Sequence, residues 1–334
     1  MKRVLKFIIV FVVVVVGLYF ISWQIDFSKR RPNWGITFSQ FYTEEKLGLD
    51  WKIVYEALLN EFDVQKLRLI AYWQYLEPTR GNFDFKDLDW QIEEAEKRNK
   101  EIILVIGYRV PRWPECHIPD WAKNVPEKEF RDTVLNYLSV VVNHYKYFSA
   151  IKVWQVENEP LLSLFGQCPK PDREFLKQEI ELVKSADPER PIMITDSGEL
   201  SSWLETAGLS EWLGTTLYRI VWNKYFGWWK HFYPSLFYTL RSFLVKTFYN
   251  TQEVIISELQ AEPWVPEGEA IIKVPFEQRN TNFDVKQLQS NLEFAQKTGI
   301  KEIYLWGVEW WYWRKINGDN TYWQFMKEFL APPL

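Results

Sequence analysis

Short apolar runs alternate with longer amphipathic segments from Trp34 to the end of the 334-residue chain, and this pattern strongly constrains the fold. Apolar runs of this length predict buried strands, and amphipathic segments predict the helices that cover them. The predicted strands are residues 34–38, 66–71, 101–107, 151–156, 191–195, 214–218, 253–258 and 302–306. The predicted helices are residues 51–62, 86–99, 127–147, 173–186, 199–207, 233–247, 284–298 and 321–330. Strict alternation of this kind is typical of βα units around a parallel sheet.

Eight βα units predict an α/β protein with a (β/α)8 TIM barrel over residues 34–334, and the length lies in the usual range for that fold. An open doubly wound sheet is the structural alternative, but it favours a glycine-rich phosphate loop after a strand, and the sequence has none. Asp84 and Asp172 are predicted to cap the second and fourth helices. Gly299 is predicted to end the seventh helix.

The N-terminal segment differs from the rest of the chain. Lys2, Arg3 and Lys6 precede an unbroken apolar run over residues 7–21, and Trp23 stands at its far edge. With its flanking residues the run reaches about 17 to 20 residues, the lower end of the length that spans a bilayer. Basic residues before such a run favour retention of the N-terminus in the cytoplasm.

A cleaved secretory signal would begin in the same way, but it would end in a small-x-small cleavage pattern that residues 22–26 lack. We therefore predict an uncleaved signal-anchor, one transmembrane helix within residues 1–27, and a short polar tether over residues 28–33. A cleaved signal is the alternative. The barrel domain, residues 34–334, is then expected outside the cytoplasm, at the cell surface or in the periplasm.

Charge, histidine and cysteine content exclude some classes of function. A net charge of −4 gives no basic footprint for nucleic acid. His117, His144 and His231 are the only histidines and none has a ligand partner at standard spacing, so no metal or other cofactor is predicted. Cys116 and Cys168 both fall in loops after predicted strands, and the sequence leaves open whether they form a disulfide or stay two thiols.

Two glutamates stand where predicted strands end. Asn158-Glu159 follows the fourth strand, and Glu258 ends the seventh. Side chains alternate between the two faces of a strand, so Val254, Ile256 and Glu258 are expected to share a face, as are residues 153, 155, 157 and 159. The carboxyl ends of barrel strands carry the chemistry of such folds. Two carboxyl groups across one cleft are the machinery of glycoside hydrolysis, one as acid/base and one as nucleophile.

Each glutamate also has a simpler interpretation. Glu159 stands where a carboxylate stabilises the start of a helix. Glu262 is a rival for the second carboxylate, and we favour Glu258 because it ends the apolar strand. Glu157 is expected to be a structural partner of the site.

These strand-end residues resemble clan A of the glycoside hydrolases, which are retaining (β/α)8 enzymes with Asn-Glu after strand four and a lone Glu ending strand seven. The second βα unit resembles a run found in families 5, 10 and 42, and it comprises Lys66-Leu67-Arg68-Leu69, Trp73, Glu77-Pro78, Gly81-Asn82-Phe83-Asp84-Phe85 and Leu88-Asp89. Strand eight ends in Leu305-Trp306-Gly307, where a tryptophan is common in the clan. The likeness covers about residues 34–330 and is greatest to cellulase-type family 5 proteins.

The resemblance implies a role for each matching residue. Glu159 would be the general acid/base and Glu258 the nucleophile of a double displacement. Asn158 would hydrogen-bond the sugar 2-hydroxyl, and Arg68 would orient the nucleophile by a charged hydrogen bond. Tyr218 would share the role of Arg68, although strand six lacks the His-x-Tyr pattern frequent in family 5.

Aromatic residues supply the remaining candidate substrate contacts. Trp306 would stack under the sugar at the site of cleavage, and Trp73, Trp113 and His117 are further candidates. Core packing is the alternative for each of these rings, as a buried ion pair inside the barrel is for Arg68.

Residues 221–249 are rich in aromatic and basic side chains. They are predicted either to pack on the barrel as its sixth helix and loop or to rest on a membrane beside the anchor.

The sequence thus predicts a membrane-anchored retaining glycoside hydrolase that acts on β-linked oligo- or polysaccharides, without a cofactor. A transglycosylase would use the same site with a sugar acceptor in place of water. A catalytically silent polysaccharide-binding barrel is the alternative from another class, although a binder has no need for both glutamates. An aldolase-type lyase would need a Schiff-base lysine or a metal cluster at a strand end, and neither is present in the sequence.

Overall fold

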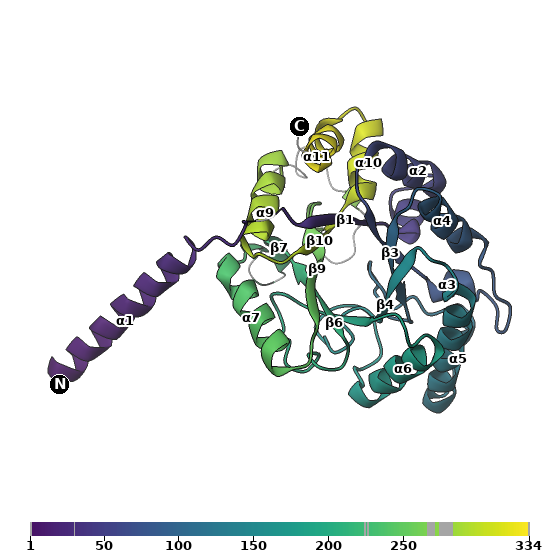
Figure 1. Ribbon diagram of the computed structural model, residues 1–334, viewed down its shortest axis with the longest axis horizontal. Coiled ribbons are helices and arrows are strands. Elements are labelled where there is room, and N and C mark those ends of the chain that lie inside the picture. Colours follow the sequence, from purple (N-terminus) through teal and green to yellow (C-terminus); the bar gives the residue numbers. More distant parts are fainter. Residues whose placement is uncertain are drawn as a thin grey trace.

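The computed structural model is a closed barrel of eight parallel strands surrounded by helices (Figure 1). It describes residues 2–29, 31–223, 225, 227–265, 271–273 and 283–332. The barrel order β1-β10-β9-β6-β5-β4-β3-β2 confirms the predicted (β/α)8 architecture. The barrel strands are β1 (Asn33–Thr37), β2 (Lys66–Ile70), β3 (Glu101–Ile106), β4 (Ile151–Val156), β5 (Ile192–Asp196), β6 (Trp212–Leu217), β9 (Glu253–Gln260) and β10 (Glu302–Trp306).

Seven of the eight predicted helices are confirmed on the outside of the barrel. They are α2 (Trp51–Glu61), α4 (Lys86–Glu96), α5 (Glu127–Tyr145), α6 (Arg173–Ala186), α7 (Ser235–Phe248), α9 (Val285–Lys297) and α11 (Thr321–Leu330). Among the described residues, the α-helices α3 (Trp73–Leu76) and α10 (Val308–Ile316) were not predicted. Nor were the short helical segments η1 (Tyr42–Lys46), η2 (Asp120–Ala122) and η4 (Ile271–Lys273).

The predicted helix over residues 199–207 is wrong, because this stretch forms a series of turns. Serine side chains accept local backbone N–H groups there: Ser197 accepts from Leu200, and Ser201 accepts from Trp203. Such local hydrogen bonds compete with the helical pattern and favour turns.

The predicted helix ends are close to the observed ones. The Asp172 side chain caps α6 by accepting the backbone N–H groups of Glu174 and Phe175. Asp84 lies one residue before the N-cap of α4 and accepts the backbone N–H of Lys86 at 3.1 Å.

The face pattern predicted for β9 is wrong. Ile255 lies inside the barrel with residues of four other strands, whereas Val254 and Ile256 pack in the larger cluster beneath the helices. The register of β9 against both β6 and β10 shifts next to Glu258. A bulge at this point interrupts the alternation of side chains, so Glu258 reaches the mouth although Ile256 faces outward.

The first helix, α1 (Lys2–Ser22), extends away from the barrel on the side of α7 and α9 (Figure 1). Within the described part of the chain, no helix qualifies by length and apolarity as a candidate membrane span. The side chains of Lys2, Arg3, Leu5 and Ile8, and Arg30 of the predicted tether, lie outside the described residues. The transmembrane assignment of residues 1–27 stays a prediction.

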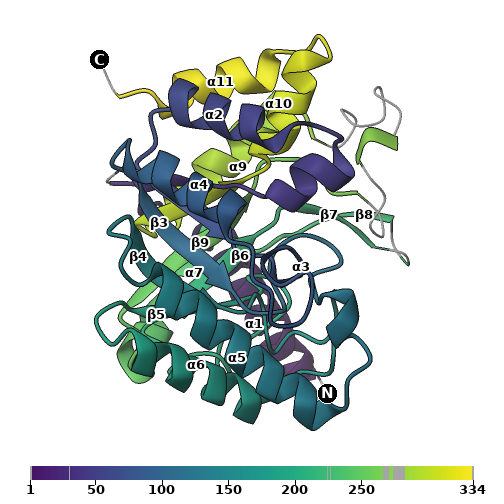
Figure 2. The same ribbon diagram turned by 90° about the vertical axis from the view of Figure 1, so that its right-hand side faces the viewer.

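A two-stranded antiparallel hairpin, β7 (Ile220–Asn223) and β8 (Gly227–Lys230), follows β6 and leads into α7. Figure 2 shows this hairpin at the end of the barrel where α3 also lies. Lys224 and Phe226 of this segment lie outside the described residues.

Cys116 and Cys168, left open by the sequence, form a disulfide with their Cα atoms 5.3 Å apart. It joins the loop after β3 to the loop after β4 across 52 residues of chain. Replacing both cysteines with serine is expected to lower the free energy of unfolding by about 2–4 kcal/mol, because the unfolded chain loses a constraint. Urea unfolding with and without reductant checks this: reductant should destabilise the parent chain and leave the serine variant unchanged.

Candidate active site

Glu258 lies near the carboxyl end of β9, where two donors hold its carboxylate. Its Oε1 accepts from Arg68 Nη1 at 3.0 Å, and its Oε2 accepts from the Tyr218 hydroxyl at 3.0 Å. Burial, followed by the charge of Glu258, raises the pKa of Tyr218 well above its usual range, so the hydroxyl remains a donor. Both carboxylate oxygens therefore have a fixed orientation, and one of their donors is charged.

Arg68 lies on β2 and joins the ends of three strands from a fully buried position. Besides Glu258, its guanidinium donates to Gln155 Oε1 at 2.8 Å and to Asn158 Oδ1 at 2.9 Å. A planar group with several donors suits this geometry, and a lysine would not reproduce it.

Asn158 follows β4 and has its amide orientation determined by its neighbours. Its Oδ1 accepts from Arg68, from Gln155 Nε2 at 3.2 Å and from the Thr195 hydroxyl at 3.1 Å. Its Nδ2 donates to Glu115 Oε2 at 3.1 Å. The remaining N–H of the amide is therefore the group that Asn158 can offer to a ligand.

Glu159 is the next residue, and its backbone N–H donates to the Thr195 hydroxyl at 2.8 Å. Burial raises the pKa of Glu159 well above its usual range, and the carboxylates of Glu258 and Glu115 raise it further. Arg109 opposes this shift. A carboxyl group whose pKa is raised in this way is suited to donate a proton.

Glu115 is a third carboxyl group of the site that the sequence reasoning missed. It lies on the loop after β3, next to the disulfide, and it is 5% exposed. Burial, followed by the charge of Glu258, raises the pKa of Glu115 to about 7. The only signal in the sequence was its place beside Cys116. That position points to the site only when the disulfide to the loop after β4 is known.

Glu157 turns away from the mouth, and the predicted common face of residues 153, 155, 157 and 159 is therefore wrong. Its carboxylate accepts the backbone N–H groups of Tyr108 at 3.0 Å and Arg109 at 2.6 Å. A Cβ atom on Gly107 would lie 2.1 Å from Glu157 Oε1, so glycine leaves the space for this carboxylate. Burial raises the pKa of Glu157 to about 7. Glu157 is a structural partner of the loop after β3, as predicted.

Backbone conformation explains the break in that pattern. Glu157 and Glu159 have φ angles of 60° and 45°, and Arg112 and Glu115 on the neighbouring loop have φ angles of 85° and 72°. Residues other than glycine rarely adopt such angles, and they cluster at sites where the surrounding structure imposes them.

Glu262, the rival of Glu258, is engaged elsewhere. Its Oε1 pairs with Arg112 Nη1, and Arg112 Nη2 pairs with Glu309 Oε2 at 2.8 Å. The structure therefore brings Glu258, rather than Glu262, together with Arg68, Tyr218 and Asn158.

Trp306 ends β10 and is 7% exposed. The guanidinium of Arg112 lies over its ring at 4.0 Å from the centroid and over the ring of Tyr42 at 3.7 Å. Arg112 therefore covers one face of the ring that was predicted to stack under a sugar.

Two of the further aromatic candidates, Trp73 and His117, are buried and held by protein partners. Trp73 is 0% exposed, donates its indole N–H to Glu77 at 2.8 Å and packs in the main core. His117 is also buried, and burial lowers its pKa to about 4. Its Nε2 lies 2.9 Å from the carbonyl oxygen of Arg112, so it supports the loop that carries Arg112 and Glu115.

Trp113, by contrast, belongs to a line of rings that reaches the carboxylates. It contacts Phe165, Phe165 contacts Trp264, and Trp264 packs edge-to-face on Tyr218, with centroid distances of 5.5, 5.8 and 5.3 Å. Because Tyr218 donates to Glu258, these rings form an aromatic wall beside Glu258.

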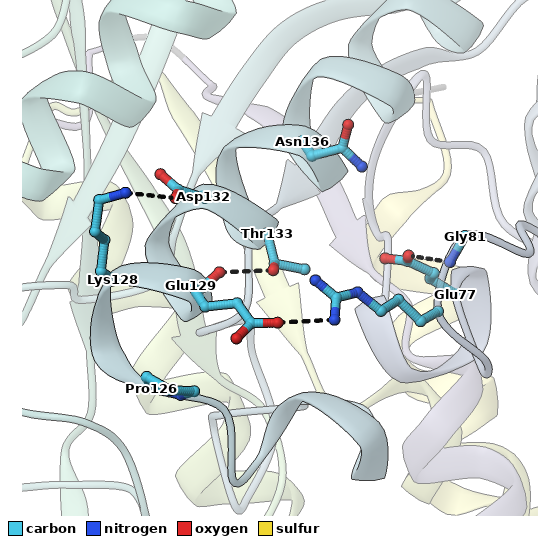
Figure 3. A pocket seen from close by; sticks show the side chains of 9 residues that line it. Glu77, Gly81, Pro126, Lys128, Glu129, Asp132, Thr133 and Asn136 are labelled. Carbon is cyan, nitrogen blue, oxygen red and sulfur yellow. Dashed lines mark hydrogen bonds and ion pairs between the residues drawn. The ribbon is translucent and has the colours of Figure 1, made fainter.

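A hollow of about 610 Å³ lies away from these glutamates, between residues 77–81 and α5 (Figure 3). Arg80 and Glu129 both line it and form an ion pair 2.7 Å long. Glu77 also lines it and accepts the backbone N–H of Gly81. None of the residues that line it belongs to the group around Glu159 and Glu258. No group of three or more potential metal ligands occurs among the described residues.

Comparison with known proteins identifies the family. The chain matches the model of glycosyl hydrolase family 10 over residues 55–316. It is 28% identical over 127 residues to endo-1,4-beta-xylanase 2 of Claviceps purpurea, an alignment that covers 36% of this chain and 37% of the xylanase. The chain thus spans about a third of the length of that curated relative.

Two solved structures have a similar fold. A psychrophilic family 10 endo-β-1,4-xylanase aligns with a TM-score of 0.53 and 16% identity, over 84% of this chain and 87% of that one. A GH5_18 protein from Streptomyces cattleya aligns with a TM-score of 0.58 and 13% identity, over 83% and 70% of the two chains.

The predicted resemblance to clan A is confirmed at the level of the clan, since families 10 and 5 both belong to it. The family whose model matches is family 10, whereas the likeness seen in the sequence was greatest to family 5. Because that model covers most of the barrel, the chain belongs to glycosyl hydrolase family 10.

Proposed function

We propose that this family 10 protein is a glycoside hydrolase that cleaves β-1,4-linked, xylan-like polysaccharides with retention, using Glu159 as acid/base and Glu258 as nucleophile. The observation that carries the proposal is the contrast between their surroundings. Burial and two neighbouring carboxylates raise the pKa of Glu159, while Arg68 and Tyr218 each donate to one oxygen of Glu258. Pairs of carboxyl groups with such opposed environments divide into acid and nucleophile.

In the first step the Glu258 carboxylate attacks the anomeric carbon while Glu159 gives its proton to the departing glycosidic oxygen. A covalent bond forms between Glu258 and the sugar as the glycosidic bond breaks. In the second step Glu159, now a carboxylate, takes a proton from water as the water oxygen displaces Glu258. The second N–H of the Asn158 amide, which has no acceptor among the described residues, would donate to the 2-hydroxyl of the sugar bound to Glu258.

The substrate class rests on the family and on one relative. Family 10 membership and the similarity to a fungal endo-1,4-beta-xylanase support a β-1,4-linked backbone of pentose sugars. The aromatic wall from Trp113 to Tyr218 gives flat surfaces for sugar rings. Transglycosylation, with a sugar hydroxyl in place of water in the second step, would use the same residues.

Covalent trapping tests the proposal. An activated 2-deoxy-2-fluoro-β-xylobioside slows both steps, and a good leaving group lets the first one proceed, so the glycosyl-enzyme accumulates. Peptide mapping by mass spectrometry should place the sugar on Glu258. Glu258→Gln should remain unlabelled and Glu262→Gln should be labelled as the parent chain is; an adduct on Glu262 would contradict the assignment. Sugar products longer than the substrate, formed with added xylobiose, would indicate transglycosylation.

Glu115 gives a prediction for the pH profile. The charge of Glu115 helps to raise the pKa of Glu159, so removing it lowers that pKa, and the acid form is lost at lower pH. Glu115→Gln is therefore expected to move the alkaline limb of kcat/KM to lower pH by about one pH unit. Xylo-oligosaccharides are the substrate to use, because their leaving group needs the proton.

Two controls accompany this pH profile. An aryl β-xyloside with a good leaving group should show a smaller displacement of the limb. Glu115→Ala removes the acceptor of Asn158 as well as the charge, so kcat should fall further than in Glu115→Gln. An unchanged limb in Glu115→Gln would show that its charge does not act on Glu159.

The protein is further proposed to be held at a membrane by α1, with the barrel outside the cytoplasm. Basic residues precede the apolar run, and the apolar side chains of α1 from Val10 to Ile21 are largely exposed. A disulfide beside the site fits an oxidising compartment. Alkaline carbonate extraction of cell membranes tests the attachment: the full chain should stay in the pellet, and recovery in the soluble fraction would contradict the proposal. External protease tests the orientation, and it should digest the barrel in spheroplasts.

A further inference from the structure

Helix α7 carries an apolar stripe on the side that faces away from the barrel. Leu240, Phe243, Leu244 and Phe248 recur at intervals of three and four residues, so they lie on one face of the helix. Phe243 and Phe248 are 61% and 70% exposed, whereas Tyr238 and Val245 on the other face are buried. Contiguous apolar surface of this kind marks an interaction site rather than ordinary solvent-facing surface.

The hairpin before α7 adds aromatic side chains to this region. Trp228 and Trp229 on β8 and Phe232 in the following loop are all exposed. Tryptophan is the side chain most typical of membrane interfaces, where its ring sits at the level of the lipid headgroups. We refer to the stripe on α7 together with Trp228, Trp229 and Phe232 as the α7 face.

The end of α1 is fastened beside the α7 face. The Tyr19 hydroxyl donates to the carbonyl oxygen of Phe232 at 2.9 Å, and the Ser235 hydroxyl donates to that of Ile25 at 3.3 Å. On the other side Trp23 packs on Phe294 of α9, with ring centroids 6.2 Å apart. Figure 1 shows α1 leaving the barrel between α7 and α9, with α7 lying across the direction in which α1 extends.

The charge of the segment favours an anionic partner. Residues 212–252 contain no Asp or Glu, and Lys230 is exposed beside Trp228 and Trp229. Lys246 is also exposed but forms an ion pair with Glu253, and Arg219 is buried, so the available positive charge among the described residues is that of Lys230. Each lysine or arginine near an anionic membrane surface contributes about 1 kcal/mol to attraction. Apolar and aromatic residues interspersed with lysines on one surface are typical of helices that lie in the lipid interface.

We propose that the α7 face rests on an anionic lipid bilayer, beside the point where α1 enters it. This rests on the membrane attachment of α1 proposed above. α7 would then lie along the membrane surface. In a (β/α)8 barrel the outer helices run antiparallel to the strands, so the barrel axis lies along the surface as well and the mouth that carries Glu159 and Glu258 opens sideways. An axis in this orientation suits a polymer that runs parallel to the membrane.

The test uses the full chain inserted into preformed vesicles of phosphatidylethanolamine and phosphatidylglycerol. Single cysteines at Phe243→Cys and Phe248→Cys carry an environment-sensitive fluorophore, while the two native cysteines remain in their disulfide. Ile53→Cys is the matched control: Ile53 is an apolar residue of α2 that is 54% exposed, and Figure 1 shows α2 on the side of the barrel away from α7.

Two quenchers then distinguish lipid from water. Brominated phosphatidylcholine in the bilayer is expected to quench labels at 243 and 248 several-fold more than a label at 53, and iodide in solution should show the reverse order. Equal quenching by iodide at all three positions, in chains that float with the vesicles, would contradict the proposed contact of the α7 face with lipid. The proposed membrane attachment of α1 would not be affected by that result. Labels shielded from iodide but not quenched by brominated lipid would show that a second copy or another protein covers the face, which also overturns the proposal. If the chain fails to float with vesicles, both proposals are overturned: the membrane attachment of α1 and the contact of the α7 face with lipid.

Discussion

Replacing Glu258 with alanine is expected to lower kcat on xylo-oligosaccharides by about 10⁴-fold or more, the scale of loss seen when a covalent enzyme loses its nucleophile. The covalent intermediate cannot form without this carboxylate. Added azide should restore turnover of an activated β-xyloside, because the small anion enters the space of the missing side chain and attacks the anomeric carbon. The product should be the α-xylosyl azide, since only one displacement takes place.

Several controls separate lost chemistry from lost structure in this variant. Thermal unfolding should show a folded protein, although Arg68 loses one of its acceptors. Glu262→Ala is the matched comparison, because Glu262 is a second buried glutamate near the end of β9 and pairs with Arg112. Azide should not produce an α-azide with Glu262→Ala, and activity in Glu258→Ala close to that of the parent chain would rule out the nucleophile assignment.

Replacing Glu159 with alanine is expected to lower kcat/KM on xylo-oligosaccharides by about 10²–10⁴-fold, the range of general acid catalysis. The glycosidic oxygen of a sugar leaves poorly without a proton. Activated aryl β-xylosides need no proton for the first step, so that step should be nearly as fast as in the parent chain and the glycosyl-enzyme should accumulate as a burst. Azide should accelerate its breakdown and give the β-xylosyl azide.

The pH dependence of kcat/KM is a second measurement on the Glu159→Ala variant. With Glu159 gone, the alkaline limb of kcat/KM for activated substrates should flatten, because the group whose pKa is raised is absent. Glu157→Gln is the control, since Glu157 is also buried and also has a raised pKa but faces α6 instead of the mouth. An equal loss on activated and unactivated substrates in Glu159→Ala would argue for a structural role of Glu159.

The barrel followed from the sequence because each of its eight strands is a short apolar run and almost every outer helix has its own amphipathic period. Those signals are local, so neither long-range pairing nor the closure of the barrel was needed to find them. The turns at residues 199–207 were misread because serine hydroxyls there compete for backbone N–H groups, and hydropathy does not register that competition.

The two glutamates also followed from the sequence, but the reason given for their facing one another was wrong. Strict alternation was assumed along β4 and β9, whereas a bulge in β9 and positive φ angles at Glu157 and Glu159 decide where the carboxylates point. A bulge depends on two neighbouring strands, and a strained backbone depends on the loops that hold it, so neither can be found in one segment.

By itself, then, the sequence determined the architecture, the family resemblance and the strand ends that carry Arg68, Asn158, Glu159 and Glu258, because these are properties of contiguous segments. Only the tertiary structure decided which carboxylates meet. In the folded chain Glu262 pairs with Arg112, and Glu157 interacts with Glu179 of α6. Glu115 lies at the site because a disulfide joins its loop to the loop after β4. The tertiary structure also placed Arg112 over Trp306 and buried Trp73 in the core. These outcomes depend on contacts between residues far apart in the chain, and the surroundings that raise the pKa of Glu159 exist only once those contacts form.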